Sequence, residues 1–335
     1  MHWCGKLSEM VLLKKLLTGR SIGILLIALF HVSSQAQGIW PSRPVKIIVP
    51  LSPGGTADAV ARLLSEKLST AWGQPVFVDN KPGGNGIIGT DVLAKAAPDG
   101  YTLGIGTLNT HITNQLVYSK IPYNSEKDFS SITLLTTSPL FLITRKSLPV
   151  QTLNEFIEYA KSNPGKLSYA TIGTGSSMHL ATEMLLQRTK ITAIHVPYKG
   201  MGAAMQDLLA GNVDFTIDIS GMSQVKNGKL KALGVASTKR YPNEPTVPSF
   251  AEQGIDQFEV SAWLSLHAPA GLPLPLQKKI NADVNKALLS PEVKEKIQAM
   301  NLDVKGGTSD ELNAHLISER KKFSAVIRAA NIKAD

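Results

Sequence analysis

Residues 45–58 constrain the fold of this chain more than any other stretch of its sequence. The run Val45-Lys46-Ile47-Ile48-Val49 is rich in β-branched residues, which is typical of a buried strand. Two prolines and the Gly54-Gly55 pair then predict a tight turn, and apolar residues recur at helical spacing between residues 60 and 68. A strand, a glycine turn and a helix N-terminus bring several backbone N–H groups together. The stretch therefore predicts an anion-binding site.

The first 36 residues differ from the rest and predict a secretory signal peptide. Basic side chains up to Arg20 precede a short apolar run at residues 22–30, and Ser34-Gln35-Ala36 places small residues before a cleavage point. The alternative is an uncleaved membrane anchor, but the apolar run is short for a membrane span. We therefore expect cleavage near Ala36 and an exported mature protein.

The only cysteine, Cys4, lies inside this predicted signal peptide. The predicted mature chain therefore has no disulfide, no thiolate metal site and no cysteine for a lipid anchor, which suits an oxidising compartment. Removing residues 1–36 takes away four Lys/Arg and one Glu, which lowers the formal net charge from +9 to +6. The remaining basic residues are spread along the chain and predict no nucleic-acid patch, whereas a modest positive field favours small anions.

Strands and helices alternate after the opening stretch. A second strand is predicted at residues 75–80, a second glycine turn at 81–86, a helix at 87–97 and a third strand at 101–107. This alternation predicts an α/β fold with a parallel sheet covered by helices. Ligands of such sheets bind at the carboxyl ends of the strands, where the three loops converge.

A second α/β series follows an interruption at Ser138-Pro139, which separates two β-rich runs within residues 129–145. Predicted helices cover residues 153–162, 178–189 and 203–210, and predicted strands cover residues 167–171, 193–197, 213–219, 230–237 and 258–268. The C-terminal part is mainly helical at residues 275–289, 291–300 and 309–331, with capping residues from Thr308 onward.

Two separate cores are favoured over one large sheet, because the strand–helix pattern stops and then resumes. We expect a signal peptide at residues 1–36, a first domain at 37–137 plus 262–335, and a second domain at 138–261. The two domains would be joined by a two-strand hinge and would close on a ligand held in the cleft between them.

Sequence templates for enzymes are not met. Gly104-Ile105-Gly106 and Gly173-Thr174-Gly175 begin like dinucleotide loops but lack the third glycine, and no P-loop sequence follows a strand. Ser176 does not lie in a G-x-S-x-G elbow. The histidines after residue 36 are scattered, without a pair at metal-binding spacing. We expect no catalytic residue, no metal and no cofactor, and a structural role for His179, which follows a glycine loop at a helix start.

The loops at predicted strand ends are instead rich in backbone donors and small hydroxyl groups. The side chains concerned are Ser52, Thr56, Asn85, Thr107, Thr174, Ser176 and Ser177. Each has an alternative reading as a helix N-cap, and capping is compatible with ligand binding. A carboxylate can be held this way without an Arg, because helix N-termini supply both N–H groups and a favourable dipole.

Two acidic residues near these loops have alternative roles. Asp58, in the first turn of its helix, would stabilise the helix end through its charge. Asp218, at the end of a strand, would either accept hydrogen bonds from a ligand amine or tie down a neighbouring loop. The residues alone leave both roles of Asp218 open.

A series of motifs covers nearly the whole predicted mature chain in order. They are Pro50-Leu51-Ser52-Pro53-Gly54-Gly55-Thr56-Ala57-Asp58 with Ala61-Arg62, Asn80-Lys81-Pro82-Gly83-Gly84-Asn85-Gly86, Pro98-Asp99-Gly100-Tyr101-Thr102-Leu103, Tyr169-Ala170-Thr171, Gly173-Thr174-Gly175-Ser176-Ser177-Met178-His179-Leu180, His195-Val196-Pro197-Tyr198-Lys199-Gly200, Ala210-Gly211-Asn212-Val213-Asp214-Phe215 and Ala268-Pro269-Ala270-Gly271-Leu272-Pro273. This series resembles the Bug/TctC family, the periplasmic solute-binding proteins of tripartite tricarboxylate transporters.

The resemblance implies a type II periplasmic-binding fold, in which two α/β domains close on a small carboxylate. It also implies that the first strand–helix loop and its counterpart in the second domain grip the ligand, partly through backbone N–H groups and bridging waters. Matching positions are Ser52, Gly54, Gly55, Thr56, Asp58, Gly84 and Asn85, then Thr174, Gly175, Ser176, Tyr198 and Asp218. We add Thr107, which ends a predicted strand. Leu51 and Asn85 depart from the family, where an aromatic and a small residue are frequent, so the ligand is not borrowed from a relative.

We therefore expect a secreted, non-enzymatic receptor that passes a small carboxylate to the membrane permease subunits of a tripartite tricarboxylate transporter. We expect a monomer that binds no nucleic acid. The alternative is a periplasmic hydrolase or lyase that uses Ser176 and His179. A third reading, the effector domain of a transcription regulator, requires an N-terminal helix-turn-helix, and the predicted export signal stands there instead.

Overall fold

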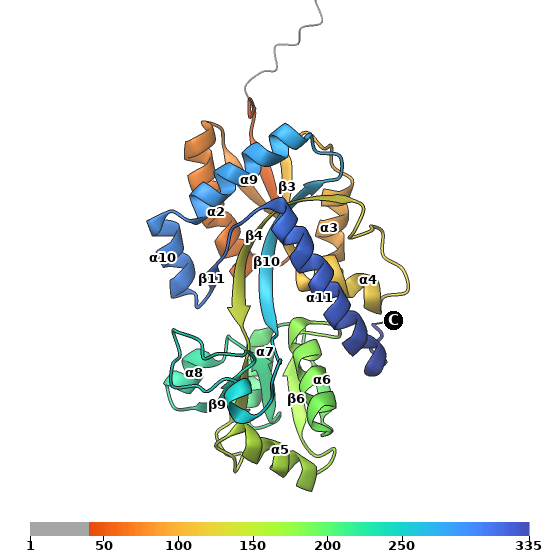
Figure 1. Ribbon diagram of the computed structural model, residues 1–335, viewed down its shortest axis with the longest axis vertical. Coiled ribbons are helices and arrows are strands. Elements are labelled where there is room, and N and C mark those ends of the chain that lie inside the picture. Colours follow the sequence, from red (N-terminus) through yellow and green to blue (C-terminus); the bar gives the residue numbers. More distant parts are fainter. Residues whose placement is uncertain (1–39, 335) are drawn as a thin grey trace, which may run out of the picture. The chain divides into compact units, whose positions relative to one another are not determined.

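The computed structural model describes residues 40–334, and all of its helices and strands lie in the unit Arg43–Asp335 (Figure 1). The predicted signal peptide lies outside the described residues. Within the described part, no helix combines the length and apolar character that crossing a membrane requires. The elements form two β-sheets with helices packed around them, which confirms the α/β fold class.

The first sheet has the strand order β11-β4-β10-β3-β1-β2. Its strands are β1 (Val45–Val49), β2 (Val76–Asn80), β3 (Thr102–Thr107), β4 (Phe129–Pro139), β10 (Ser261–Pro269) and β11 (Asp303–Val304). β1 pairs in parallel with both β2 and β3, as predicted. The sheet as a whole is mixed and not parallel, because β10 runs antiparallel to β3 and to β4.

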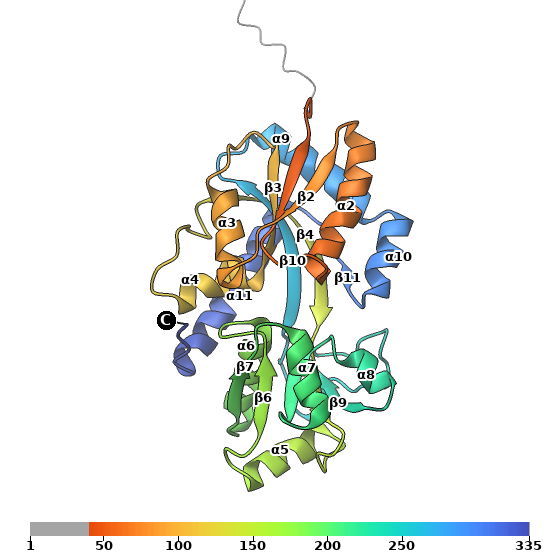
Figure 2. The ribbon, with the colours of Figure 1, turned by 180° about the vertical axis from the view of Figure 1, so that it is seen from behind.

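Helices from both ends of the chain surround this first sheet. They are α2 (Thr56–Trp72), α3 (Ile87–Ala94), α4 (Asn114–Val117), α9 (Leu274–Leu288), α10 (Pro291–Ala299) and α11 (Ser309–Ala329), with the short turns η1 (Gly84–Gly86) and η2 (Asn109–Thr113). Figure 2 shows α2 beside α10, so helices that lie far apart in the sequence pack together beside this sheet. Of the four apolar positions of α2 predicted from spacing, Val60, Leu64 and Leu68 are fully buried, whereas Leu63 is only partly buried.

The second sheet has the order β7-β6-β8-β5-β9. Its strands are β5 (Phe141–Arg145), β6 (Ser168–Thr171), β7 (Ile194–Pro197), β8 (Phe215–Asp218) and β9 (Leu230–Val235), and its helices are α5 (Leu153–Ser162), α6 (Ser177–Thr189), α7 (Met201–Ala210), α8 (Met222–Lys226) and the turn η3 (Ala251–Gln253). β6 pairs in parallel with β7 and β8. Both sheets therefore contain three adjacent parallel strands.

The chain passes between the sheets at Leu140, between β4 and β5, and returns just before β10. These positions lie close to the predicted limits of the second domain, residues 138–261. The division into domains at those residues stays a prediction.

One buried apolar cluster includes residues from both sheets. Leu142 and Phe215 come from strands of the second sheet, Leu185 comes from α6, and Trp263 comes from β10 of the first sheet. Phe323 of α11 is fully buried in the same cluster. The C-terminal helix thus packs against β4 and also against α6, and it connects the cores of the two sheets.

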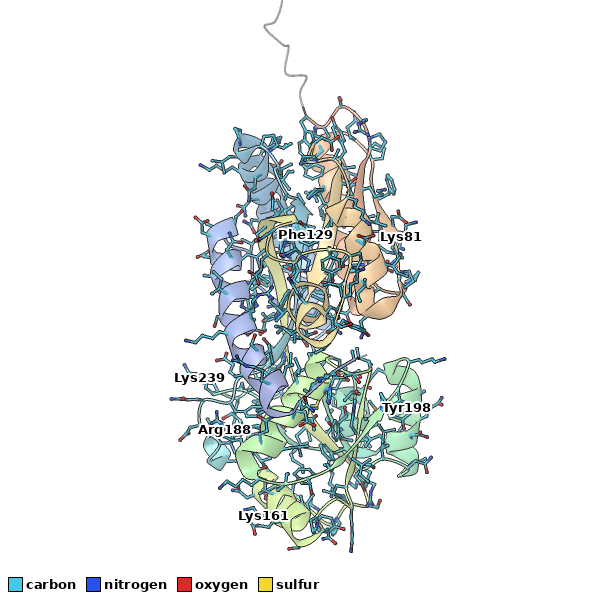
Figure 3. All side chains as sticks on the ribbon, turned by 90° about the vertical axis from the view of Figure 1, so that its right-hand side faces the viewer. Lys81, Phe129, Lys161, Arg188, Tyr198 and Lys239 are labelled. Carbon is cyan, nitrogen blue, oxygen red and sulfur yellow. The ribbon has the colours of Figure 1, made fainter. Side chains whose placement is uncertain are left out.

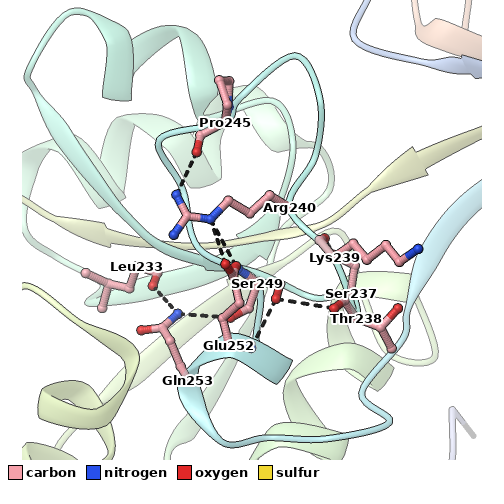
Figure 4. Close-up of polar contacts among 9 residues, drawn as sticks. All are labelled: Leu233, Ser237, Thr238, Lys239, Arg240, Pro245, Ser249, Glu252 and Gln253. Atoms are coloured by element: carbon pink, nitrogen blue, oxygen red, sulfur yellow. Dashed lines mark hydrogen bonds and ion pairs between the residues drawn. The ribbon is translucent and has the colours of Figure 1, made fainter.

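The segment between β9 and β10 has little regular structure and is held by side-chain bonds (Figure 4). Arg240 Nε donates to both carboxylate oxygens of Glu252 at 2.9 and 3.0 Å, and Arg240 Nη1 donates to the carbonyl of Pro245 at 2.8 Å. Gln253 Nε2 donates to the carbonyl of Leu233 in β9 at 3.0 Å. These bonds fasten the segment against the second sheet.

Candidate ligand-binding site

The first candidate loop joins β1 to α2, at the carboxyl end of β1. Residues 51–56 are exposed, and Gly54 adopts φ +84°, a left-handed conformation that favours glycine. Gly55 is the N-cap of α2 and has no side chain with which to cap it. The N–H groups of the first turn therefore lack both helical and side-chain partners, as the sequence predicts.

Asp58 supports this loop from within. The residue is only 4% exposed, and Oδ2 accepts from the Gly54 N–H at 3.0 Å and from Arg62 Nε at 2.9 Å. The hydrogen bond from Arg62 is the largest cause that holds the pKa of Asp58 below its usual range, against the opposing effect of burial. The structure thus gives Asp58 a supporting role behind the loop.

The second candidate loop joins β2 to α3 and lies beside the first. Asn85 adopts φ +52°, and its Nδ2 donates to Tyr118 Oη at 2.9 Å, while its carbonyl accepts from Asn114 Nδ2 at 3.1 Å. A Cβ built on Gly86 would lie 2.7 Å from Thr110 Cγ2 and 3.3 Å from the carbonyl oxygen of Pro50. Only glycine fits there, and the two loops pack together through Pro50.

Thr107 ends β3, next to the first two loops. Its N–H donates to Thr110 Oγ1 at 2.9 Å, and its Oγ1 accepts from the Thr110 N–H at 3.3 Å. Because β2, β1 and β3 are adjacent and parallel, the predicted residues of the first half gather at one edge of the first sheet.

The second sheet presents a corresponding loop between β6 and α6. Gly173 and Gly175 adopt φ +125° and +76°, and Thr174 between them is half-buried. Ser176 is 1% exposed and caps α6, since its Oγ accepts from the His179 N–H at 3.3 Å. The Ser176 hydroxyl is therefore used inside the protein.

Two further predicted residues follow the strands on either side of β6. Tyr198, just after β7, donates from Oη to Asp207 Oδ2 at 2.6 Å, and burial raises the pKa of Tyr198 to about 12. Asp218 ends β8, is 3% exposed and accepts from the Ser220 N–H at 2.9 Å. Burial raises the pKa of Asp218. Of the two roles left open for Asp218, this geometry matches the tying of a loop.

The loops of the two sheets approach each other. A Cβ built on Gly173 would lie 3.8 Å from Asn85 Oδ1, and one on Gly175 would lie 3.3 Å from Val117 Cγ2. Figure 3 labels Lys81, which begins the second loop, and Tyr198, which follows β7, on these two parts of the molecule. The structure therefore brings the predicted residues into two groups that face one another at Asn85 and Gly173.

Sequence reasoning missed the residues that hold the second loop. Asn114 and Tyr118 lie four residues apart in a segment for which we predicted no element, and both bond to Asn85. A signal was available, since Asn and Tyr at helical spacing place two polar groups on one face of a helix.

The prediction that the histidines are scattered holds along the chain but is wrong in space. His111 stacks on His267 with ring centroids 3.9 Å apart, and His179 stacks on His195 at 4.0 Å. Within residues 40–334, no group of three or more His, Cys, Asp or Glu side chains is arranged to hold a metal ion.

The geometry needed by the alternative enzyme reading is not formed. His179 Nδ1 accepts from the Gly175 N–H at 3.0 Å, and Nε2 lies 3.9 Å from Glu183 Oε1. In the described part of the chain, neither ring nitrogen of His179 bonds to the Ser176 hydroxyl, so these two residues do not form a nucleophile–base pair in this structure.

Comparisons with known proteins address the resemblance directly. The model of the tripartite tricarboxylate transporter family receptor, TctC, matches residues 60–332. The chain belongs to this receptor family. The TctC receptors and the structural neighbours named below are solute-binding proteins.

Three relatives give the extent of the similarity. Protein BugT of Bordetella pertussis is 34% identical over 317 residues, which cover 93% of this chain and 97% of BugT. The structure of Rpa4515 of R. palustris with adipate is 34% identical with a TM-score of 0.80, covering 88% of this chain and 99% of that one. MatC of Rhodopseudomonas palustris with bound malate is 34% identical with a TM-score of 0.76, covering 86% and 100%. The predicted Bug/TctC membership and two-domain binding-protein fold are confirmed.

Proposed function

We propose that this receptor captures a small organic carboxylate in the periplasm and delivers it to the membrane subunits of a tripartite tricarboxylate-type transporter. The candidate site comprises Ser52, Gly54, Gly55, Thr56, Gly84, Asn85 and Thr107 on the first sheet and Thr174, Gly175 and Tyr198 on the second. Asp58, Ser176 and Asp218 support the loops from within. The ligand would lie between the two groups.

The observation that carries the proposal is a pair of loops that face each other at the carboxyl ends of parallel strands. The loop before α2 leads into a helix that no side chain caps, and the loop before α6 is rich in glycine. The N–H groups in the first turn of α2 have no helical or side-chain partner and follow the exposed loop at residues 51–56, and the Gly173–Gly175 turn approaches from the second sheet. Such N–H groups and the helix dipole stabilise a carboxylate.

The cations near the first two loops have carboxylate partners of their own. Arg62 bonds to Asp58 at 2.9 Å, and Lys81 Nζ lies 3.2 Å from Asp79 Oδ1. Recognition through backbone donors therefore fits this site better than a dedicated arginine clamp. Relatives with adipate and with malate support a dicarboxylate as the first ligand to test.

The family and the predicted signal peptide support the proposed export and transport. Family members are receptors of tripartite tricarboxylate transporters, and the signal at residues 1–36 would deliver the chain to the periplasm. A permease partner can be sought by cross-linking in membranes of the native organism.

Isothermal titration calorimetry tests the proposal directly. The purified chain is titrated with adipate, malate, tricarboxylates, acidic amino acids and aromatic acids. We expect saturable binding of at least one acid, and binding of none would contradict the proposal. Nuclear magnetic resonance of the bound acid over time tests the enzyme alternative, because turnover that His179→Ala abolishes would favour a hydrolase or lyase.

A further inference from the structure

Two stacked imidazoles lie directly behind the loop between β6 and α6. His179 in α6 and His195 in β7 have ring centroids 4.0 Å apart and planes inclined by 8°, and Tyr169 stacks on His195 at 5.0 Å. His179 is 6% exposed. Burial, with a smaller contribution from His195, lowers the pKa of His179 to about 3, so this ring is neutral near pH 7.

The hydrogen bonds of His179 fix its tautomer. Nδ1 accepts from the Gly175 N–H at 3.0 Å, so the ring proton must sit on Nε2. Nε2 faces Glu183 Oε1 at 3.9 Å, and that oxygen already accepts from Tyr169 Oη at 2.7 Å. The lone pair of Nδ1 is therefore directed permanently at the loop.

His195 holds the other end of the same loop. Its Nε2 lies 2.7 Å from Thr171 Oγ1, and Thr171 Oγ1 accepts from the Gly173 N–H at 3.1 Å. The N–H groups of Gly173 and Gly175 are thus both used inside the protein. The N–H groups of Ser177 and Met178, in the first turn of α6, have no partner from helix geometry.

We propose that His179 is a positioning residue for the ligand: its Nδ1 lone pair holds the Gly175 amide, and this sets the path of residues 173–177. Gly175 adopts φ +76°, which glycine reaches without strain, so glycine permits this path and the bond to His179 selects it from the many conformations open to a glycine backbone. The ligand part of this inference rests on the proposed function, whereas the Gly175–His179 bond stands without it.

Three variants separate positioning from simple packing. His179→Phe keeps an aromatic ring but has no acceptor, and His179→Gln places its amide near Nε2 instead of Nδ1. His179→Asn places its carbonyl oxygen near the Nδ1 position and should restore the bond. Urea unfolding measures the free energy of global unfolding of each variant. The amide exchange rates are then corrected for differences in that free energy.

Hydrogen exchange at the Gly175 amide is the first readout. After that correction, we expect about tenfold faster exchange in the Phe and Gln variants, as the loss of one buried hydrogen bond predicts, and near-normal exchange in the Asn variant. Unchanged exchange in the Phe variant would overturn the inference.

Affinity for adipate and malate is the second readout. Whichever acid binds the unmodified chain should bind the Phe and Gln variants more weakly and the Asn variant normally. Normal affinity in all three variants would remove the ligand part of the inference. If neither acid binds the unmodified chain, the function remains to be tested with the wider acid panel, and exchange at Gly175 still decides the positioning role.

Should the variants fail to fold, the unmodified chain decides the question. Nitrogen-15 spectra of the His179 ring should show a bare Nδ1, a protonated Nε2 and a coupling from Nδ1 to the Gly175 amide. A proton on Nδ1 would overturn the inference.

Discussion

Thr56 is the first residue of α2, where its N–H has no helical partner. Gly55 before it has φ −83° and ψ 173°, an extended conformation that a residue preceding proline also prefers. Proline is well tolerated at the first position of a helix. The N–H of Thr56 can therefore be removed without disturbing the helix.

We predict that Thr56→Pro weakens carboxylate binding while leaving the fold intact. Loss of one charge-assisted hydrogen bond costs roughly 1.5–3 kcal/mol, or about 10- to 150-fold in affinity. Calorimetry with the acid that binds best measures the effect, and circular dichroism checks the fold.

Thr56→Ala is the matched control, because it removes the hydroxyl but keeps the N–H. If Thr56→Ala loses less affinity than Thr56→Pro, the difference in affinity between the two variants is assigned to the backbone N–H of Thr56. Equal affinity of the Pro variant and the unmodified chain would remove this loop from the site.

Among the elements, the turn η2 and strand β10 are joined by a buried histidine stack. His111 and His267 are 1% and 0% exposed, and a Cβ on Gly106 of β3 would lie only 2.7 Å from the His267 ring. Burial lowers the pKa of His111 to about 3, with Arg320 adding to the effect, and lowers the pKa of His267 well below 6.5.

These lowered pKa values predict acid destabilisation. In the unfolded chain the histidines take up protons as the pH falls through 6.5, whereas His111 in the folded chain does so only near pH 3. The stabilisation is thus complete above pH 6.5 and is lost as the pH falls, at about 1.4 kcal/mol per pH unit for each histidine.

His111→Phe isolates this contribution by removing one titrating ring. The unfolding free energy of the unmodified chain, minus that of the variant, should fall by about 1.4 kcal/mol per pH unit between about pH 6 and pH 4. Urea unfolding at several pH values measures it. A difference that does not vary with pH would contradict the prediction.

The long elements could be predicted because their local patterns agree with their packing. The helix predicted at residues 153–162 occurs as α5 at those residues, and Thr308 forms a capping box with Glu311 at the start of α11. Residues 109–117 were missed because Leu108, Ile112 and Val117 become apolar contacts only when β3 and α11 lie beside them.

The loops of the candidate site could be predicted from the sequence, but most of the contacts that their individual atoms make could not. Strand ends and glycines located Gly54 and Gly175, because local sequence determines turns. β10 pairs antiparallel with β3 and β4, and His111 contacts His267. Both features bring together residues that lie far apart in the sequence. No local pattern encodes such contacts, and the burial of Ser176 likewise depends on packing around α6.

In the whole described molecule, the shared cluster ties both sheets to α11. Phe323 has no exposed surface and lies in one cluster with Phe215 of the second sheet and Trp263 of the first. Because these contacts are common to both sheets, the unfolding of one should destabilise the other.

We predict that Phe323→Ala lowers the unfolding free energy by about 3–5 kcal/mol and keeps a single cooperative transition. Tryptophan fluorescence follows the first sheet through Trp72 and Trp263, and amide exchange at Tyr169 and Phe215 follows the second. Ile317→Ala is the matched control on the same helix, because Ile317 is 71% exposed and should change stability by less than about 0.5 kcal/mol. Separate transitions for the two sheets would contradict the prediction.

The close approach of Pro50 to Gly86 and Gly89 has a practical consequence for redesign. A Cβ on Gly89 would come within 2.8 Å of Pro50 Cα, so the loop after β1 and the start of α3 have no freedom to shift independently. Leu51 and Asn85, the two positions that depart from the family pattern, sit on these interlocked pieces. Because these loops belong to the proposed site, we expect that retargeting the receptor to another acid requires residues 50–55 and 82–89 to be exchanged together from one donor protein.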